Sequence, residues 1–303
     1  MSRPSPPARL ASRAVPGALY MLGAGLCFTA ANAITRHVTF DLGLASTAEA
    51  FYQYAFALLF SLPMLWQTGL ASLRTRRPIA HLLRVLVSAL GVQAFVYAFA
   101  SGVPMGQVIA LVMTSPFFIT IGAAVLLHEK VAPQRWWAST VAFAGALLIL
   151  RPWSSALTLH AWAPVAAAVL WGAATLLTKR LLDDEPPATV TVWLLLLMTP
   201  VNLGFSLAEG HQWPSAAMVG YLVASGLAMA LAQLLLAKSY AVADAAYVQP
   251  FDGLKLPLNF LAGWLVFGDS PHPALWAGAA LILAASYYNL RYETLREKRL
   301  AAA

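Results

Sequence analysis

Charged residues are scarce in this chain. Only 10% of its 303 residues are Asp, Glu, Lys or Arg, whereas 60% are hydrophobic and the mean hydropathy is +0.70. A soluble protein of this composition would lack most of the charged surface that such proteins carry. The composition therefore indicates a protein embedded in a membrane, with the lipid bilayer as its first partner.

Cysteine is almost absent, and the motifs of several enzyme classes are missing. The single Cys27 can form neither an internal disulfide nor a thiolate metal cluster. The chain has no Gly-x-x-x-x-Gly-Lys-[Ser/Thr] loop for ATP hydrolysis and no His-Glu-x-x-His zinc motif. We therefore expect no enzymatic activity, no metal and no cofactor.

Apolar windows long enough to cross a bilayer as helices, about 20 residues each, recur along the sequence. They lie near 17–36, 47–68, 81–100, 104–127, 134–151, 162–181, 188–208, 216–237, 245–267 and 273–291. With the N-terminus in the cytoplasm, sixteen of the 19 Lys and Arg residues are cytoplasmic, Arg36 and Arg151 lie opposite, and Lys255 remains in the membrane. The positive-inside rule thus predicts that both termini are cytoplasmic. The net charge of +7 then needs no nucleic acid to explain it.

Two short tails flank the spans. Residues 1–16 contain several Pro and Arg residues but no apolar core of a signal peptide, so we expect a disordered cytoplasmic tail. Residues 292–303 are expected to form a second cytoplasmic tail. The membrane part divides into 17–151 and 162–291, with five spans in each half.

The two halves resemble each other in sequence. Pro133-Gln-Arg-Trp136 reappears as Pro273-Ala-Leu-Trp276, and Pro63 and Pro116 correspond to Pro200 and Pro257. Because each half has an odd number of spans, the second half must enter the membrane from the opposite side. This predicts two inverted five-helix repeats, an arrangement typical of secondary transporters that bind substrate near the bilayer midplane.

Leu127-His-Glu129, followed by Pro133, Trp136 and a helix rich in Gly and Ala, resembles the end of an EamA repeat. The chain is identified as a member of the ten-helix branch of the drug/metabolite transporter superfamily, and is similar to bacterial aromatic amino acid exporters. The resemblance implies an all-α fold in the bacterial inner membrane. Spans one, three, four, six, eight and nine would line a central cavity, and spans five and ten would be peripheral.

Span nine contains an unusual polar face. Asp252, Lys255 and Asn259 are spaced i, i+3, i+7, so they share one side of a helix. Each charge costs about 2.5–3.5 kcal/mol at the centre of a membrane helix, so this face should meet protein or water. Lys255 would bind a carboxylate and Asp252 an ammonium. The alternative is a structural ion pair between the two.

The other candidate substrate contacts are aromatic, amide or hydroxyl residues inside the spans. They are Phe28 and Asn32 in span one, Gln93 and Tyr97 in span three, Trp171 and Thr175 in span six, and Gln233 in span eight. Rings would stack on an amphipathic solute and amides would bond to it, with helix packing as the alternative role. Pro116 and Pro257 each remove a helical hydrogen bond, and with Gly253 they are predicted hinges.

Three further groups lie near the span ends. Glu49 opens span two and is placed to pair with Arg36 or Arg151. His81 and Arg84 lie at the cytoplasmic boundary, where snorkelling toward the headgroups is expected.

These features favour a secondary transporter or facilitator of small amphipathic metabolites, working by alternating access of the two halves without an obligate protein partner. Amino acids are the expected substrates, with aromatic amino acid export as the narrower version. The alternatives are an intramembrane lipid-modifying enzyme or a passive channel. An Asp252 paired with Lys255 would titrate poorly, so weak proton coupling or facilitated diffusion is expected.

Overall fold

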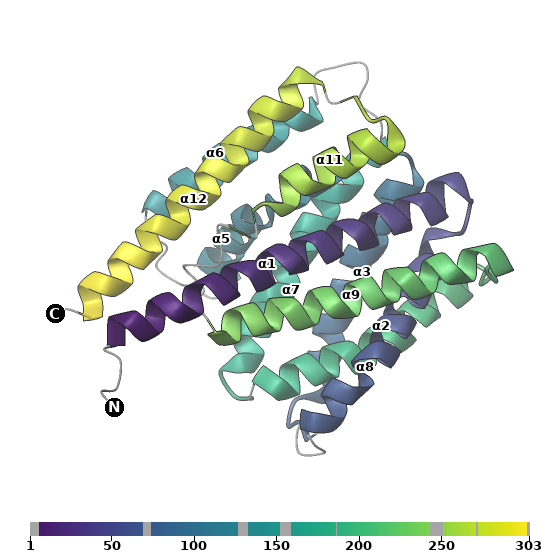
Figure 1. Cartoon of the computed structure of the whole chain (residues 1–303), viewed down its shortest axis with the longest axis horizontal. Helices are drawn as coiled ribbons and strands as arrows, with labels where there is room; N and C mark the ends of the chain where they lie inside the picture. The colour runs from purple at the N-terminus through teal and green to yellow at the C-terminus, as the bar shows by residue number, and fades with distance from the viewer. Residues whose placement is uncertain are drawn as a thin grey trace.

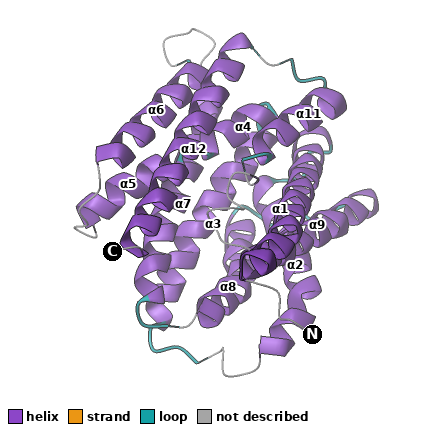
Figure 2. Cartoon of the chain, turned by 60° about the vertical axis from the view of Figure 1, so that its left-hand side comes forward, coloured by secondary structure: helices purple, strands orange, loops and turns teal. Residues whose placement is uncertain are grey.

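The computed structural model describes residues 6–68, 74–126, 133–151, 159–185, 187–242, 251, 253–270 and 272–301, and in these ranges the chain is helical, without strands (Figure 2). The elements are α1 (Pro6–Arg36), η1 (His37–Asp41), α2 (Ser46–Thr68), α3 (Pro78–Ala100), α4 (Met105–Val112), α5 (Ser115–Leu126), α6 (Pro133–Leu150), η3 (Leu159–Trp162), α7 (Ala163–Leu182), α8 (Pro187–Ala208), α9 (Ala216–Val242), α11 (Lys255–Phe267) and α12 (Pro273–Ala301).

Five of these helical segments are long and apolar enough to cross a membrane. They are Pro16–Asp41, Pro78–Ala100, Met105–Val125, His160–Thr178 and Ala216–Ser239, and shorter apolar helices cover Trp136–Leu150, Val192–Ala208, Lys255–Phe267 and Pro273–Ala285. Large side chains such as Leu59, Leu265 and Val266 are exposed, as expected where lipid replaces water. The predicted all-helical membrane architecture is confirmed.

The helix boundaries follow the predicted spans closely. Pro133 and Pro273 each open a helix, a position where the missing N–H of proline costs no hydrogen bond. Two ends differ from the prediction. The helix α1 begins at Pro6, inside the predicted disordered tail, because Ala, Leu and Arg there favour helix. For the same reason α12 continues to Ala301 through the second predicted tail.

The helices pack in pairs that exchange under a twofold operation between the halves. The pair α1 with α9 corresponds to α7 with α3, α2 with α9 to α8 with α3, and α1 with α11 to α7 with α5, while α2 with α8 and α6 with α12 are their own counterparts. In Figure 1, α6 and α12 form one edge of the bundle and α2 and α8 the opposite edge. This packing agrees with two repeats and with the peripheral place expected for spans five and ten.

Side-chain contacts between the loops fall into two groups, one for each end of the bundle. One group joins the loops after spans one, five, seven and nine through Ala45 with Gln212, Thr47 with Glu209, and Arg151 with His272. The other joins the loops after spans two and six through Thr75, Arg76 and Arg77 with Asp184 and Glu185. Ten spans that alternate in direction would divide the loops into these two groups. The charge distribution predicts that the second end is cytoplasmic.

Two glycines bring α6 and α12 into direct backbone contact. A Cβ on Gly278 would lie 2.4 Å from the carbonyl oxygen of Gly145, and a Cβ on Gly145 would lie 2.6 Å from that of Gly278. Gly226 similarly brings α9 against α2, where a Cβ would lie 2.3 Å from Cβ of Phe56. Small residues allow this close approach. The resulting packing contact stabilises helix association in lipid, where no hydrophobic effect drives helices together.

Candidate functional site

Turns in the described residues accompany two of the spans. The helix of span four stops at Val112 and resumes at Ser115, and a turn at Gly253 and Leu254 precedes α11 in span nine. The first interruption is near the middle of the span Met105–Val125. Interrupted spans in transporters supply backbone and side-chain groups to a substrate site.

The freed backbone groups at these turns find local partners. Thr114 donates from Oγ1 to the carbonyl oxygen of Leu111 over 2.6 Å, and Thr120 donates to that of Pro116 over 2.8 Å. At the second turn, the N–H of Leu256 donates to the carbonyl oxygen of Gly253 over 3.2 Å. The hinge role of Pro116, Gly253 and Pro257 stays a prediction, and all three lie at or beside the turns.

A buried amide cluster joins α11 to the middle of α1. Asn259 is fully buried, and its Oδ1 accepts a hydrogen bond from Nδ2 of Asn32 over 3.0 Å. Its own Nδ2 donates to Oγ1 of Thr29 over 3.0 Å and to the carbonyl oxygen of Lys255 over 2.7 Å. Thr29 in turn donates to the carbonyl oxygen of Gly25. The predicted residues Asn32 and Asn259 thus form one polar group inside the membrane part.

Lys255 lies one helical turn before Asn259 on the same face. Its Nζ is 4.7 Å from the centre of the Phe28 ring, a cation–π arrangement worth about 0.5–2 kcal/mol. The lysine stem packs beside Gly25 at ordinary contact distance, since a Cβ there would lie 3.7 Å from Cγ of Lys255. Four predicted site residues, Phe28, Asn32, Lys255 and Asn259, therefore come together. We call this set, with Thr29, the α1–α11 cluster.

Trp171 lies in a separate aromatic group formed by α3 and α7. Its Nε1 donates to the carbonyl oxygen of Ser88 over 3.2 Å, and its ring packs on Gly91, where a Cβ would lie 2.6 Å away. The ring centre is 5.3 Å from that of Phe95, which also stacks edge-on against Phe99. These three contacts hold the indole against α3.

The other predicted contacts are spread over the bundle. Gln93 donates to Oδ1 of Asn202 over 2.8 Å, while Tyr97 is 44% exposed and its hydroxyl lies 2.8 Å from Nδ1 of His160. Thr175 is exposed and donates to the carbonyl oxygen of Trp171 in its own helix. Gln233 is exposed on α9. Asp252 lies outside the described residues.

The expected partner of Glu49 is wrong, because both arginines bind other groups. Arg36 pairs bidentately with Asp269, and Arg151 bonds to His272. Gly268 ends α11 with φ +66, which turns Asp269 toward α1, and its Oδ2 also accepts from the backbone N–H of Met105 over 3.2 Å. This role of Asp269 was not predicted, although Gly268 after an apolar helix is a usual signal for the helix end that positions it.

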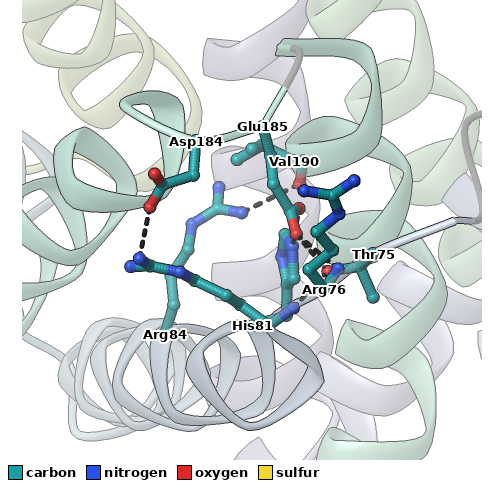
Figure 3. A network of polar contacts seen from close by, with 8 residues as sticks. Thr75, Arg76, His81, Arg84, Asp184, Glu185 and Val190 are labelled. Atoms are coloured by element: carbon teal, nitrogen blue, oxygen red, sulfur yellow. Dashed lines mark hydrogen bonds and ion pairs between the residues drawn. The ribbon is translucent and has the colours of Figure 1, made fainter.

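The snorkelling expected of His81 and Arg84 is also wrong, since both are buried (Figure 3). Nε2 of His81 lies 2.6 Å from Oε2 of Glu185, and Arg84 donates to the carbonyl oxygen of Val190 over 2.9 Å. Thr75 also bonds to Glu185. These contacts link α3 of the first half to the start of α8 in the second. The cost of removing His81 and Arg84 from water is therefore offset by their hydrogen-bond partners.

Glu185 lies in the loop between spans and is nearly fully buried. Burial by itself raises the pKa of its carboxyl. Hydrogen bonds from Thr75, from His81 and from the backbone N–H of Arg76, together with the charge of His81, outweigh that effect and lower the pKa. Glu185, whose contacts are drawn in Figure 3, is therefore held as a carboxylate.

Comparison with known proteins supports this architecture along the whole chain. The model of the EamA-like transporter family matches residues 15–151 and 159–291, one match for each predicted half. A solved crystal structure superposes with a TM-score of 0.59 over 96% of this chain and 99% of the other, at 18% sequence identity. That superposition shows the shared fold.

Several bacterial relatives carry functional names. A "Riboflavin transporter" of Rhizobium johnstonii is 53% identical over 96% of both chains, and one of Vibrio cholerae is 46% identical over 93% of this chain and 95% of its own. An "S-adenosylmethionine uptake transporter" of Rickettsia bellii is 25% identical over 82% of this chain and 85% of its own. These relatives give no support to the expected amino acid substrate or to export.

Proposed function

The chain belongs to the EamA-like transporter family, and we propose that it carries riboflavin across the membrane through the α1–α11 cluster. It is a multi-pass membrane transporter and not an enzyme. The observation that supports riboflavin most is the similarity to riboflavin transporters over almost the whole chain. The contacts of the cluster agree with the chemistry of a flavin.

Riboflavin is a neutral molecule with a planar ring system, whose pyrimidine edge carries an N–H donor and carbonyl acceptors. The side-chain amides of Asn32 and Asn259 carry the same two kinds of group in a buried place, and a flavin would exchange its own hydrogen bonds for the one that joins them here. A flat ring would stack on Phe28, and Lys255 beside it would bond to a flavin carbonyl or a ribityl hydroxyl. A zwitterionic substrate is not needed to explain any of these groups.

Alternating access would move the site between the two sides of the membrane. The cluster joins α1 of the first half to α11 of the second, so rocking of the halves changes its geometry directly. The turns at Met113–Thr114 and Gly253–Leu254 supply the places where the spans can bend. Binding energy from the ring would then be available to shift the equilibrium between the two states.

The test is flux of labelled riboflavin into liposomes that contain the purified protein. We expect saturable uptake that excess unlabelled riboflavin suppresses and that phenylalanine, tryptophan and S-adenosylmethionine do not. Empty liposomes and protein with Asn259→Leu provide the controls. Uptake of an aromatic amino acid without saturable riboflavin flux would overturn the proposal and restore the amino acid interpretation. Flux that rises linearly with concentration would instead indicate a channel.

A further inference from the structure

A carboxylate lies buried where three helices of the two halves meet. Glu49, in the first turn of α2, is fully buried, and its Oε1 accepts a hydrogen bond from Oγ1 of Thr35 on α1 over 2.6 Å. Its Oε2 is buried too, and among the described residues it has no hydrogen-bond partner. One oxygen of the carboxylate is thus satisfied and the other is not.

The hydrogen bonds around Glu49 have a fixed direction. Gln53 uses its Nε2 to donate to Oγ1 of Thr35 over 2.9 Å and to Oγ of Ser225 on α9 over 2.7 Å, and the same Nε2 makes a longer contact of 3.4 Å with Oε1 of Glu49. Because the Thr35 oxygen accepts from Gln53, its own proton is directed at Glu49. No further donor in the described structure reaches Oε2. The arrangement suits a carboxyl group whose proton sits on Oε2.

The charged groups nearby are engaged elsewhere. On the elements packed against Glu49, Arg36 pairs with Asp269, His37 with Asp41, Glu209 with Thr47, and His211 with Tyr52 and Ser206. Tyr54 on α2 and Tyr20, Cys27, Tyr221 and Lys238 on α1 and α9 are further titratable groups of these helices. Within the described residues, no cation forms an ion pair with Glu49. A buried carboxylate without a counter-ion is far more costly than the neutral acid.

Water can reach Oε2 only if the helices around it separate. Gly226 holds α9 so close to α2 that a Cβ there would lie 3.1 Å from the carbonyl oxygen of Gln53. Separation of α2 from α9 moves the first half relative to the second, as alternating access requires. Glu49 would then be hydrated and ionised in the open arrangement and protonated in the closed one described here.

We propose that Glu49 is a proton-binding site whose occupancy accompanies closure of the bundle end formed by the loops after spans one and seven. On closing, a proton from water on that side forms an O–H bond at Oε2, and on opening the same bond breaks and the proton returns to the water. The group is not part of the α1–α11 cluster. The inference rests on the proposed function only in its transport readout.

The transport test is riboflavin exchange at equal concentration and equal pH on both sides of the liposome, from about pH 5 to about pH 8. Closing that takes up one proton becomes less favourable as pH rises, so wild-type exchange should fall by up to about tenfold per pH unit at the alkaline end. The E49Q variant, a permanent neutral mimic, should exchange at the rate of the acidic wild type at every pH. The control variants E209Q and H211Q should keep the wild-type profile.

A second measurement does not depend on riboflavin, and its decisive outcome needs only the wild-type protein. The infrared spectrum of the purified wild-type protein at neutral pH should contain the C=O band of a buried carboxylic acid, and E49Q should lack it. Wild-type protein that exchanges no riboflavin at any pH would overturn the proposed riboflavin transport but not the proton-binding site. Three outcomes would each overturn the proton-binding site: wild-type exchange at a rate independent of pH, an E49Q variant with the wild-type pH profile, or a wild-type spectrum without the acid band.

Discussion

Asn32 donates a side-chain hydrogen bond to Asn259 over 3.0 Å, although the two residues are 227 positions apart in the sequence. The bond crosses from the first repeat to the second inside the membrane part. Asn259 is fully buried and uses its remaining donor groups on Thr29 and on the carbonyl oxygen of Lys255. An amide that is bonded to both repeats is sensitive to their relative position.

Asn259→Leu should lower riboflavin flux at limiting substrate by about tenfold, because a lost amide contact is worth about 1.4 kcal/mol of binding. The substitution also leaves Asn32 and Thr29 without a partner, so a modest fall in melting temperature is expected. Initial rates in liposomes over a riboflavin series measure the first effect. Thr140→Val removes an exposed hydroxyl that bonds only within its own helix, and it should leave flux unchanged. Equal flux in both variants would rule out substrate contact at Asn259.

The charge and the donor groups of Lys255 should matter more for transport than the exact shape of its side chain. Lys255→Arg keeps a cation over the Phe28 ring and should retain at least about half of the wild-type flux. Lys255→Met fills similar space without a donor and should raise KM by about fivefold or more. Rates for both variants, with expression measured in the same membranes, provide the check. Full activity of Lys255→Met would show that the ammonium serves neither substrate nor structure.

The spans were predictable because the bilayer fixes the length of an apolar helix and repeats that length along the chain. The spans predicted near 134–151 and 273–291 begin within one residue of α6 and α12, which open at Pro133 and Pro273. The starting point of α1 was not predicted, because the composition of residues 6–16 suits both a helix and a disordered tail. The contacts between loops agree with spans that alternate in direction, whereas the cytoplasmic side that charge counting assigns stays a prediction.

The candidate site was only partly predictable. Spacing along one helix placed Lys255 and Asn259 together, but it gave no information on which residues of α1 face them. Partners between spans depend on helix rotation and register, which hydropathy does not encode. This explains why Glu49 was assigned to an arginine and why Gln93, bonded to Asn202, gave no signal that separates packing from binding.

The contact between α6 and α12 predicts a sharp difference between two glycines. Gly278→Ala would place a methyl group 2.4 Å from the carbonyl oxygen of Gly145, so the helices must separate at a cost of about 1–3 kcal/mol. Gly220→Ala faces open space on α9 and should be neutral or slightly stabilising, since alanine favours helix. Melting temperatures of both variants in detergent measure the difference. A Gly278→Ala variant as stable as Gly220→Ala would contradict the close approach.

Acid should weaken the link between the loops after spans two and six. Glu185 accepts from Thr75 and from the N–H of Arg76 and pairs with His81, which lowers its pKa despite burial. A carboxyl with a folded pKa below its unfolded value adds stability at neutral pH and loses it as pH falls through the folded pKa. The melting temperature of the wild-type protein should therefore fall when the pH is lowered below about 4.

Glu185→Gln should have a free energy of unfolding lower by about 3 kcal/mol at neutral pH, and it should lose less stability on acidification. The exposed Asp183, as Asp183→Asn, should keep the wild-type profile. An unchanged acid response in Glu185→Gln would exclude this carboxyl as its source.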